Sequence, residues 1–65
     1  MKVEVEREVD GRWIGEVPAL PGVLVYADSE TEARAKAEAL ALRVIADKLE
    51  KGEPVPHEAR QLFAA

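Results

Sequence analysis

The chain has 65 residues and a formal net charge of −4, with 13 Asp and Glu residues against 9 Lys and Arg residues and no cysteine. A domain of this size removes only roughly 60% of its unfolded surface from water on folding, and the lack of cysteine excludes disulfides and cysteine zinc sites as sources of stability. We therefore expect one domain over residues 1–65 that is stabilised as a homo-oligomer, with no cofactor and no metal ion.

The charge and the first residues also narrow the possible partners. An acidic chain is repelled by phosphate backbones, so we expect no direct nucleic-acid binding and favour a basic partner. The N-terminal residues are charged and alternating rather than a basic segment followed by an apolar one. No apolar run approaches the roughly 20 residues that cross a bilayer. We expect a cytoplasmic protein without membrane contact.

Residues 2–9 alternate between apolar and charged side chains, which is the period of a half-buried strand. The Asp10-Gly11 pair that follows indicates a hairpin. A two-residue turn would place charged side chains opposite apolar ones on one face, which strand pairing disfavours. A three-residue loop with Gly11 in the left-handed bulge position instead pairs Arg7 with Trp13 and allows a cation–π contact between them. The second strand then covers residues 12–17.

Two prolines separate this strand from the next. Pro18 ends the second strand because it has no N–H to donate to the sheet, and Pro21-Gly22 predicts a type II turn. Residues 23–27 form the third expected strand. They are apolar on both faces, so we expect a helix to cover one face and another surface, such as a second subunit, to cover the other.

A long helix is expected to begin at Ser29 and to end before Gly52. Ser29 as N-cap and Glu32 three residues later form a capping-box pattern, and glycine is the usual residue just after a helix. The apolar helix residues form two stripes, one of Ala33, Ala37, Leu40 and Val44, the other of Leu42, Ile45 and Leu49. One sheet cannot bury both stripes. The second packs against the C-terminal tail or contacts another subunit, and we favour contact.

The candidate interface for a partner or a second subunit is therefore Tyr26, Leu42, Ile45 and Leu49. After Gly52, residues 53–56 contain two prolines and predict an extended connector. His57 follows the connector and is expected to be exposed. Residues 60–64 predict a short fourth strand. The expected fold is α+β, with a three-stranded antiparallel meander, one long helix and this C-terminal strand.

The residues give little support for an enzyme. A two-metal nuclease needs carboxylates converging from several elements, and residues 60–65 contain none. His57 has no nucleophile or metal partner at a suitable spacing, and Ser29 is explained as a helix cap. We expect no catalytic residue, no cofactor-binding residue and no metal ligand.

Several motifs follow one another in a fixed order: an Asp-Gly turn, a strand with tryptophan, the segment VPALPG, an apolar strand, an acidic helix start and the segment GEPVP. The residues concerned are Asp10, Gly11, Trp13, Val17, Pro18, Leu20, Pro21, Gly22, residues 29–33, Gly52, Glu53, Pro54 and Pro56. In this order and spacing, over nearly the whole chain, the sequence resembles the HicB family of antitoxins, specifically its small N-terminal domain.

The resemblance implies a partial ribonuclease H-like fold, with a returning fourth strand. It also implies a role in a toxin–antitoxin system, in which the domain binds a small basic HicA-like toxin that cleaves mRNA and covers its catalytic surface. Family members that repress their own operon carry a DNA-binding segment after this domain. No such segment follows here, so DNA binding is not expected. The alternative is a non-enzymatic, homo-oligomeric structural, regulatory or small-ligand-binding domain without a toxin.

Overall fold

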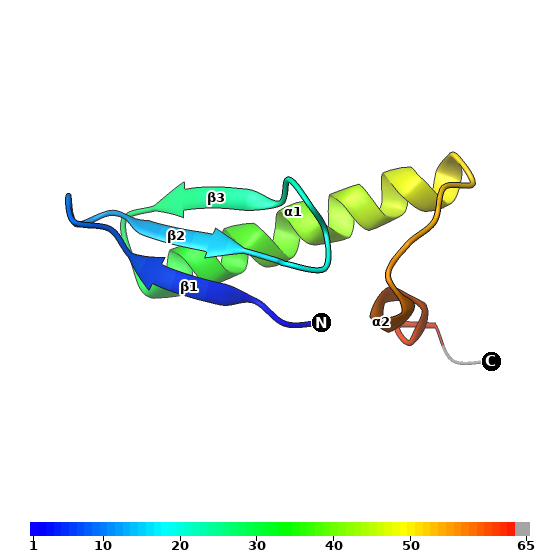
Figure 1. Ribbon diagram of the computed structural model, residues 1–65, viewed down its shortest axis with the longest axis horizontal. Coiled ribbons are helices and arrows are strands. Elements are labelled where there is room, and N and C mark those ends of the chain that lie inside the picture. Colours follow the sequence, from blue (N-terminus) through cyan, green and yellow to red (C-terminus); the bar gives the residue numbers. More distant parts are fainter. Residues whose placement is uncertain (64–65) are drawn as a thin grey trace.

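Three strands form an antiparallel meander in the order β1-β2-β3 in the computed structural model, which describes residues 1–63, and one long helix packs against this sheet (Figure 1). The elements are β1 (Glu4–Arg7), β2 (Trp13–Glu16), β3 (Leu24–Ala27), α1 (Glu30–Glu50) and α2 (His57–Arg60). The α+β class, the meander and the long helix agree with the sequence-based expectation, and each strand is shorter than the segment that predicted it.

The β1–β2 hairpin has the register that the alternating pattern predicts. Arg7 lies opposite Trp13, and the Glu8 amide donates a hydrogen bond to the Arg12 carbonyl at 2.7 Å. Gly11 closes the three-residue loop with a φ of +91°, a left-handed conformation that glycine adopts without steric cost. The cation–π contact differs from the expectation, because it joins Arg12, just before β2, to Tyr26 on β3.

The segment VPALPG is a compact corner between β2 and β3. The Leu20 amide donates to the Val17 carbonyl at 2.9 Å, and the Val23 amide donates to the Leu20 carbonyl at 3.0 Å. The second bond closes the predicted turn over Pro21 and Gly22, with Gly22 at a φ of +91° as a type II turn requires. Leu20 is only 1% exposed, so the corner also anchors the core.

Helix α1 is capped at both ends by hydrogen bonds from residues next to its ends in the sequence. Ser29 Oγ accepts a hydrogen bond from the Glu32 amide at 3.1 Å, as predicted, while Glu32 Oε1 accepts from the amide of Asp28 at 3.1 Å. The reciprocal bond of the box is thus made one residue earlier than in the usual motif. At the other end, the Gly52 and Glu53 amides donate to the carbonyls of the last turn, which is a Schellman motif.

The buried side of α1 corrects the predicted stripes. Its buried residues are Ala33, Ala37, Ala41 and Ile45, spaced four apart. Because 3.6 residues make one turn, such a row winds slowly around the helix. The row therefore faces the sheet at its start. Further along the helix it includes Ile45, which the sequence places in the second stripe and which is buried in the same core. Leu40, Val44 and Leu49 pack beside this core and are half-buried.

The C-terminal segment does not form the expected fourth strand. Residues 57–60 form α2, residues 61–63 form a turn and a bend, and Ala64 lies outside the described residues. Ala59, on α2, is buried in the same core as Ile45. The 21 residues of α1 extend about 31 Å, whereas a four-residue strand extends about 13 Å. The tail therefore returns beside a part of α1 that extends past the sheet, where there is no strand to pair with (Figure 1).

Candidate partner-binding surface

One face of the sheet is turned away from α1. A Cβ atom added to Gly15 would lie 2.4 Å from the carbonyl oxygen of Ala33, so Gly15 faces the helix. Side chains alternate along a strand, so Ile14 and Glu16 point to the opposite side. The strand pairing adds their neighbours. We call this surface the open sheet face, formed by Glu4, Glu6, Ile14, Glu16, Leu24 and Tyr26.

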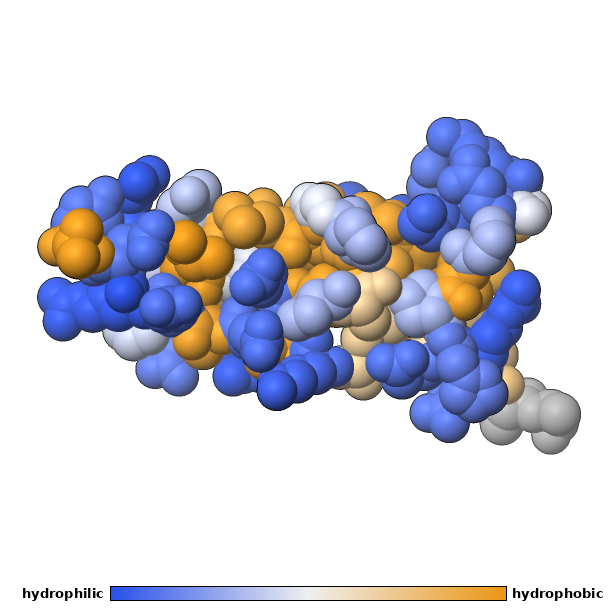
Figure 2. Space-filling model, in the orientation of Figure 1, coloured by the Kyte–Doolittle hydropathy of each residue, from blue (hydrophilic) through white to orange (hydrophobic). Residues whose placement is uncertain are grey.

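The open sheet face combines an apolar centre with acidic side chains. Ile14 pairs directly with Tyr26, and Leu24 pairs with Glu16. Leu24 is 45% exposed and Tyr26 44% exposed, so water reaches both. Hydrophobic surface also lies between hydrophilic groups along the middle of the molecule in Figure 2, while the two ends are largely hydrophilic. An apolar centre with a polar surround is the usual anatomy of a protein interface.

Two carboxylates face each other on this surface. Glu4 is paired with Glu16 across β1 and β2, an arrangement that repulsion disfavours. Lys2 Nζ lies 3.5 Å from Glu4 Oε2 and compensates one of the charges in part. Among residues 1–63, no ion pair involves Glu16. The open sheet face thus has more negative than positive charge.

Arg12 organises one end of this face. Its guanidinium carbon lies 4.5 Å from the centre of the Tyr26 ring, and its Nε donates to Asp10 Oδ2 at 2.8 Å. The Arg12 amide also donates to Asp10, at 3.0 Å. This amide bond and the side-chain bond lower the pKa of Asp10 from its usual 3.8. Tyr26 is therefore held in place by a fixed cation while its ring remains exposed.

The four predicted interface residues fall into two groups. Tyr26 and Leu42 are exposed, Leu42 by 57%, whereas Ile45 is 4% exposed and belongs to the chain's own core. Leu49 is half-buried against that core. Ile45 thus shares its core with Ala59 of the tail, which is the tail packing given above as the alternative to subunit contact. The structure does not bring Tyr26 and Leu42 together, since one lies on the open sheet face and the other on α1.

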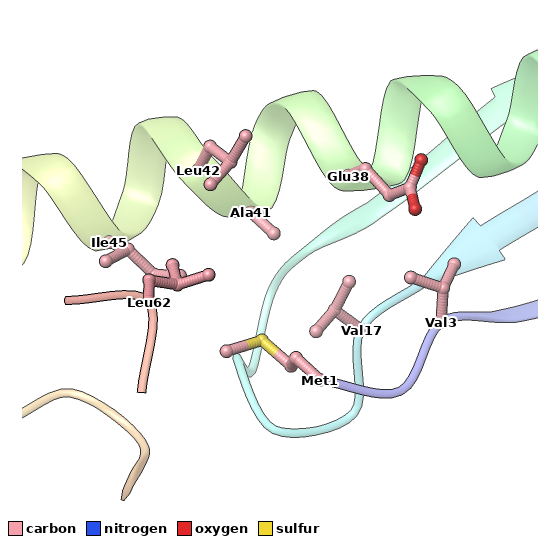
Figure 3. Close-up of a pocket in the computed structure, with 8 residues that line it drawn as sticks. All are labelled: Met1, Val3, Val17, Glu38, Ala41, Leu42, Ile45 and Leu62. Atoms are coloured by element: carbon pink, nitrogen blue, oxygen red, sulfur yellow. The ribbon is translucent and has the colours of Figure 1, made fainter. Parts of the chain in front are cut away.

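Leu42 instead lines an apolar groove of about 330 Å³ on the helix side of the sheet, opposite the open sheet face. The groove lies between α1, the N-terminal segment and the tail, and Figure 3 shows the side chains of Leu42, Met1 and Leu62 around the same space. Its full lining is Met1, Val3, Val17, Glu38, Ala41, Leu42, Ile45 and Leu62. Glu38 contributes the one carboxylate of this lining.

Sequence reasoning missed Ile14 and Leu24 as members of the open sheet face. The signal was present in the register of the hairpin, because pairing Arg7 with Trp13 already places Ile14 opposite Glu6. Leu24 requires the geometry of the VPALPG corner, which composition alone does not fix. His57 is exposed as expected, although it begins α2 instead of lying in the connector.

Residues 1–63 contain no group of three or more His, Cys, Asp or Glu side chains that could hold a metal ion. Within the same range, no helix is both long enough and apolar enough to cross a membrane. Comparisons of the chain with protein-family models, curated proteins and solved structures found no match.

Proposed function

We propose that the chain is a non-enzymatic, cytoplasmic HicB-like antitoxin domain that binds a small basic mRNA-cleaving toxin of the HicA type and covers its catalytic surface. The observation that carries this proposal is the open sheet face, on which three carboxylates lie beside three apolar side chains. The meander and the one long helix also match part of the arrangement that the sequence resemblance implies, although its fourth strand is absent from residues 60–63.

The facing pair Glu4 and Glu16 favours a cationic partner. Like charges directly opposite on a sheet destabilise it by about 0.2–1 kcal/mol, and one Lys or Arg of a partner placed between them removes that repulsion on binding. Negative charge on this face also attracts a basic protein from a distance and raises its association rate. Ile14, Leu24 and Tyr26 then supply the apolar contact that slows dissociation.

The first experiment is co-expression of the chain with the product of a neighbouring reading frame that encodes a short basic protein, followed by affinity capture. The double variant Glu4→Lys/Glu16→Lys should lose capture and should no longer restore growth when the toxin is expressed. The matched control is Glu50→Lys/Glu58→Lys, which changes the net charge equally but alters two exposed acids on α1 and α2. The proposal would be contradicted if both double variants lost capture of the basic protein equally, or if the wild-type chain did not capture it at all.

Ionic strength gives an independent measurement. The association rate of the wild-type pair should fall steeply as salt is raised, because exposed charges are screened within about 10 Å at 0.1 M salt. The Glu4→Lys/Glu16→Lys variant should show a much weaker salt dependence. An association rate that ignores salt would mean that the acidic side chains do not guide binding.

The apolar groove favours a second candidate function, a regulatory oligomer that binds a small apolar molecule. A largely apolar cavity of about 330 Å³ is at the small end of the ligand sites of proteins. Octanol, used as a probe, should then raise the melting temperature of the wild-type chain, and Leu42→Asn should abolish that rise. Leu24→Asn, which alters the open sheet face, is the matched control and should leave the rise intact.

A further inference from the structure

The two outer strands of the sheet present different edges. β1 alternates acidic side chains along its length, with Glu4 and Glu6 on the open sheet face. β3 consists of Leu24, Val25, Tyr26 and Ala27, without a charged residue and without proline. Charges and prolines are the usual means by which proteins prevent edge strands from pairing with other chains. β1 carries such protection, whereas β3 does not.

The backbone groups that point outward from β3 follow from the hydrogen bonds already made. The Val17 amide donates to the Val23 carbonyl at 3.2 Å, so this opposed pair is a hydrogen-bonded one. Bonded and non-bonded pairs alternate along antiparallel strands, which directs the N–H and C=O of Leu24 and Tyr26 to the free edge. The next outward amide, that of Asp28, already donates to Glu32.

We propose that this edge pairs with β3 of a second copy, so that two chains form one continuous six-stranded antiparallel sheet. With Val25 at the two-fold axis, Leu24 of each copy lies opposite Tyr26 of the other. This register uses every outward N–H and C=O of Leu24 and Tyr26, four hydrogen bonds in all. Shifting the axis to Tyr26 would place Leu24 opposite Asp28, whose amide is occupied.

The side chains agree with this register. Leu24 and Tyr26 are both nearly half exposed, and in the paired sheet each covers the other across the new interface. Aromatic and aliphatic side chains directly opposite each other stabilise antiparallel strands. The equivalent pairing of β1 with itself, with Glu6 at the two-fold axis and Val5 opposite Arg7, would place the Glu6 carboxylates of the two copies against each other. The occupant of the β3 edge is therefore a second copy of the chain joined through β3 alone.

This inference specifies how the expected homo-oligomer forms, and it does not depend on a toxin. The paired sheet leaves Glu4 on the outermost strand β1 and Glu16 on the middle strand β2, so neither lies on the strand that forms the new interface. A failure of β3 pairing would thus appear as a monomer that still captures the toxin. A failure of the proposed function would appear as a dimer that captures nothing.

Analytical ultracentrifugation of the purified chain tests the pairing. The wild type should sediment at twice the single-chain mass of 7.1 kDa at high micromolar concentration. Leu24→Pro removes one outward N–H from each copy, which is two of the four bonds, together with the leucine side chain, and should weaken the dimer about tenfold to a hundredfold. Tyr26→Lys should weaken it similarly. Leu42→Lys, an equal change on the exposed side of α1, should leave it unchanged, and circular dichroism should show that all variants remain folded.

Hydrogen exchange on the wild-type chain tests the register without any substitution. The amides of Leu24 and Tyr26 should become protected as concentration rises through the dissociation constant. The amides of Val5 and Arg7, which the same alternation directs to the free edge of β1, should exchange rapidly throughout. A monomer at all concentrations, a dimer lost only in Leu42→Lys, or an open-ended polymer with both edges protected would each overturn the proposal.

Discussion

Gly15 of β2 lies so close to Ala33 of α1 that a Cβ atom at Gly15 would be 2.4 Å from the Ala33 carbonyl oxygen. The obstacle is helix backbone, which cannot rotate away as a side chain would. The same added atom would lie 3.2 Å from the Cβ of Ala37. Glycine on the strand and alanines on the helix therefore set the distance between the two layers of the fold.

We predict that Gly15→Ala destabilises the chain by at least about 2 kcal/mol, because α1 has to move away from the sheet to admit the methyl group. Urea denaturation followed by circular dichroism measures the loss. Gly11→Ala is the comparison, since its added Cβ meets nothing within 4 Å and only the left-handed φ is strained. Amide chemical shifts along α1 should move in Gly15→Ala and stay in place in Gly11→Ala; unchanged shifts in both would contradict the close contact.

Ser29→Ala should cost about 1 kcal/mol, because it removes the acceptor for the Glu32 amide at the start of α1. Thermal unfolding monitored by helical ellipticity measures the effect. Thr31→Ala provides the control, as it removes a neighbouring exposed hydroxyl from the first turn and should be neutral or slightly stabilising. Equal losses in the two variants would show that the hydroxyl of Ser29 has no special role.

The Glu32 carboxylate should make stability depend on pH. The hydrogen bond from the Asp28 amide, and then the charge of Lys36, lower the pKa of Glu32 from its usual 4.5. A lowered folded-state pKa means that the charged form stabilises the fold above the unfolded-state value, and that this contribution is lost as the pH falls through the folded-state value. Glu32→Gln should therefore be less stable than wild type at neutral pH and equal to it in strong acid. A difference that is constant with pH would contradict this assignment.

Truncation should destabilise the chain far more at Ile45 than at Leu42, although the sequence places both residues in one stripe. Ile45→Ala removes a core side chain and should cost about 2–4 kcal/mol. Leu42→Ala removes a side chain that is 57% exposed and should change the free energy of unfolding by less than about 0.5 kcal/mol. Chemical denaturation of the two variants decides the matter. A large loss in Leu42→Ala would mean that another surface covers this residue in solution.

The sequence was sufficient for the parts of the fold that local chemistry determines. The β1–β2 register followed from excluding charged-to-apolar pairs, which left Arg7 opposite Trp13. The start of α1 followed from Ser29 and Glu32, and its end from Gly52. In each case residues close in sequence make the interactions that decide the structure, so no knowledge of distant contacts was needed.

The parts that were not predicted depend on distant contacts. Residues 60–64 have strand-forming character, but a strand needs a neighbour, and the tail returns beside the helix rather than beside a sheet edge. Ile45 is buried because Ala59 and the VPALPG corner reach it. The open sheet face was missed in part because Leu24 is aligned with Glu16 only through that corner.

Along α1 the buried row begins with three alanines and ends with Ile45. Small side chains thus lie where the helix packs on the sheet. The larger Ile45 lies beyond them, where the VPALPG corner and the tail pack on the helix in place of the sheet, so the space beside the helix widens toward this end. Such a space is filled only when the small side chains lie at its narrow end and the large one at its wide end. The order of small before large side chains therefore determines which end of the helix packs on the strands. The reverse order would leave a void at the wide end and a steric clash at the narrow end.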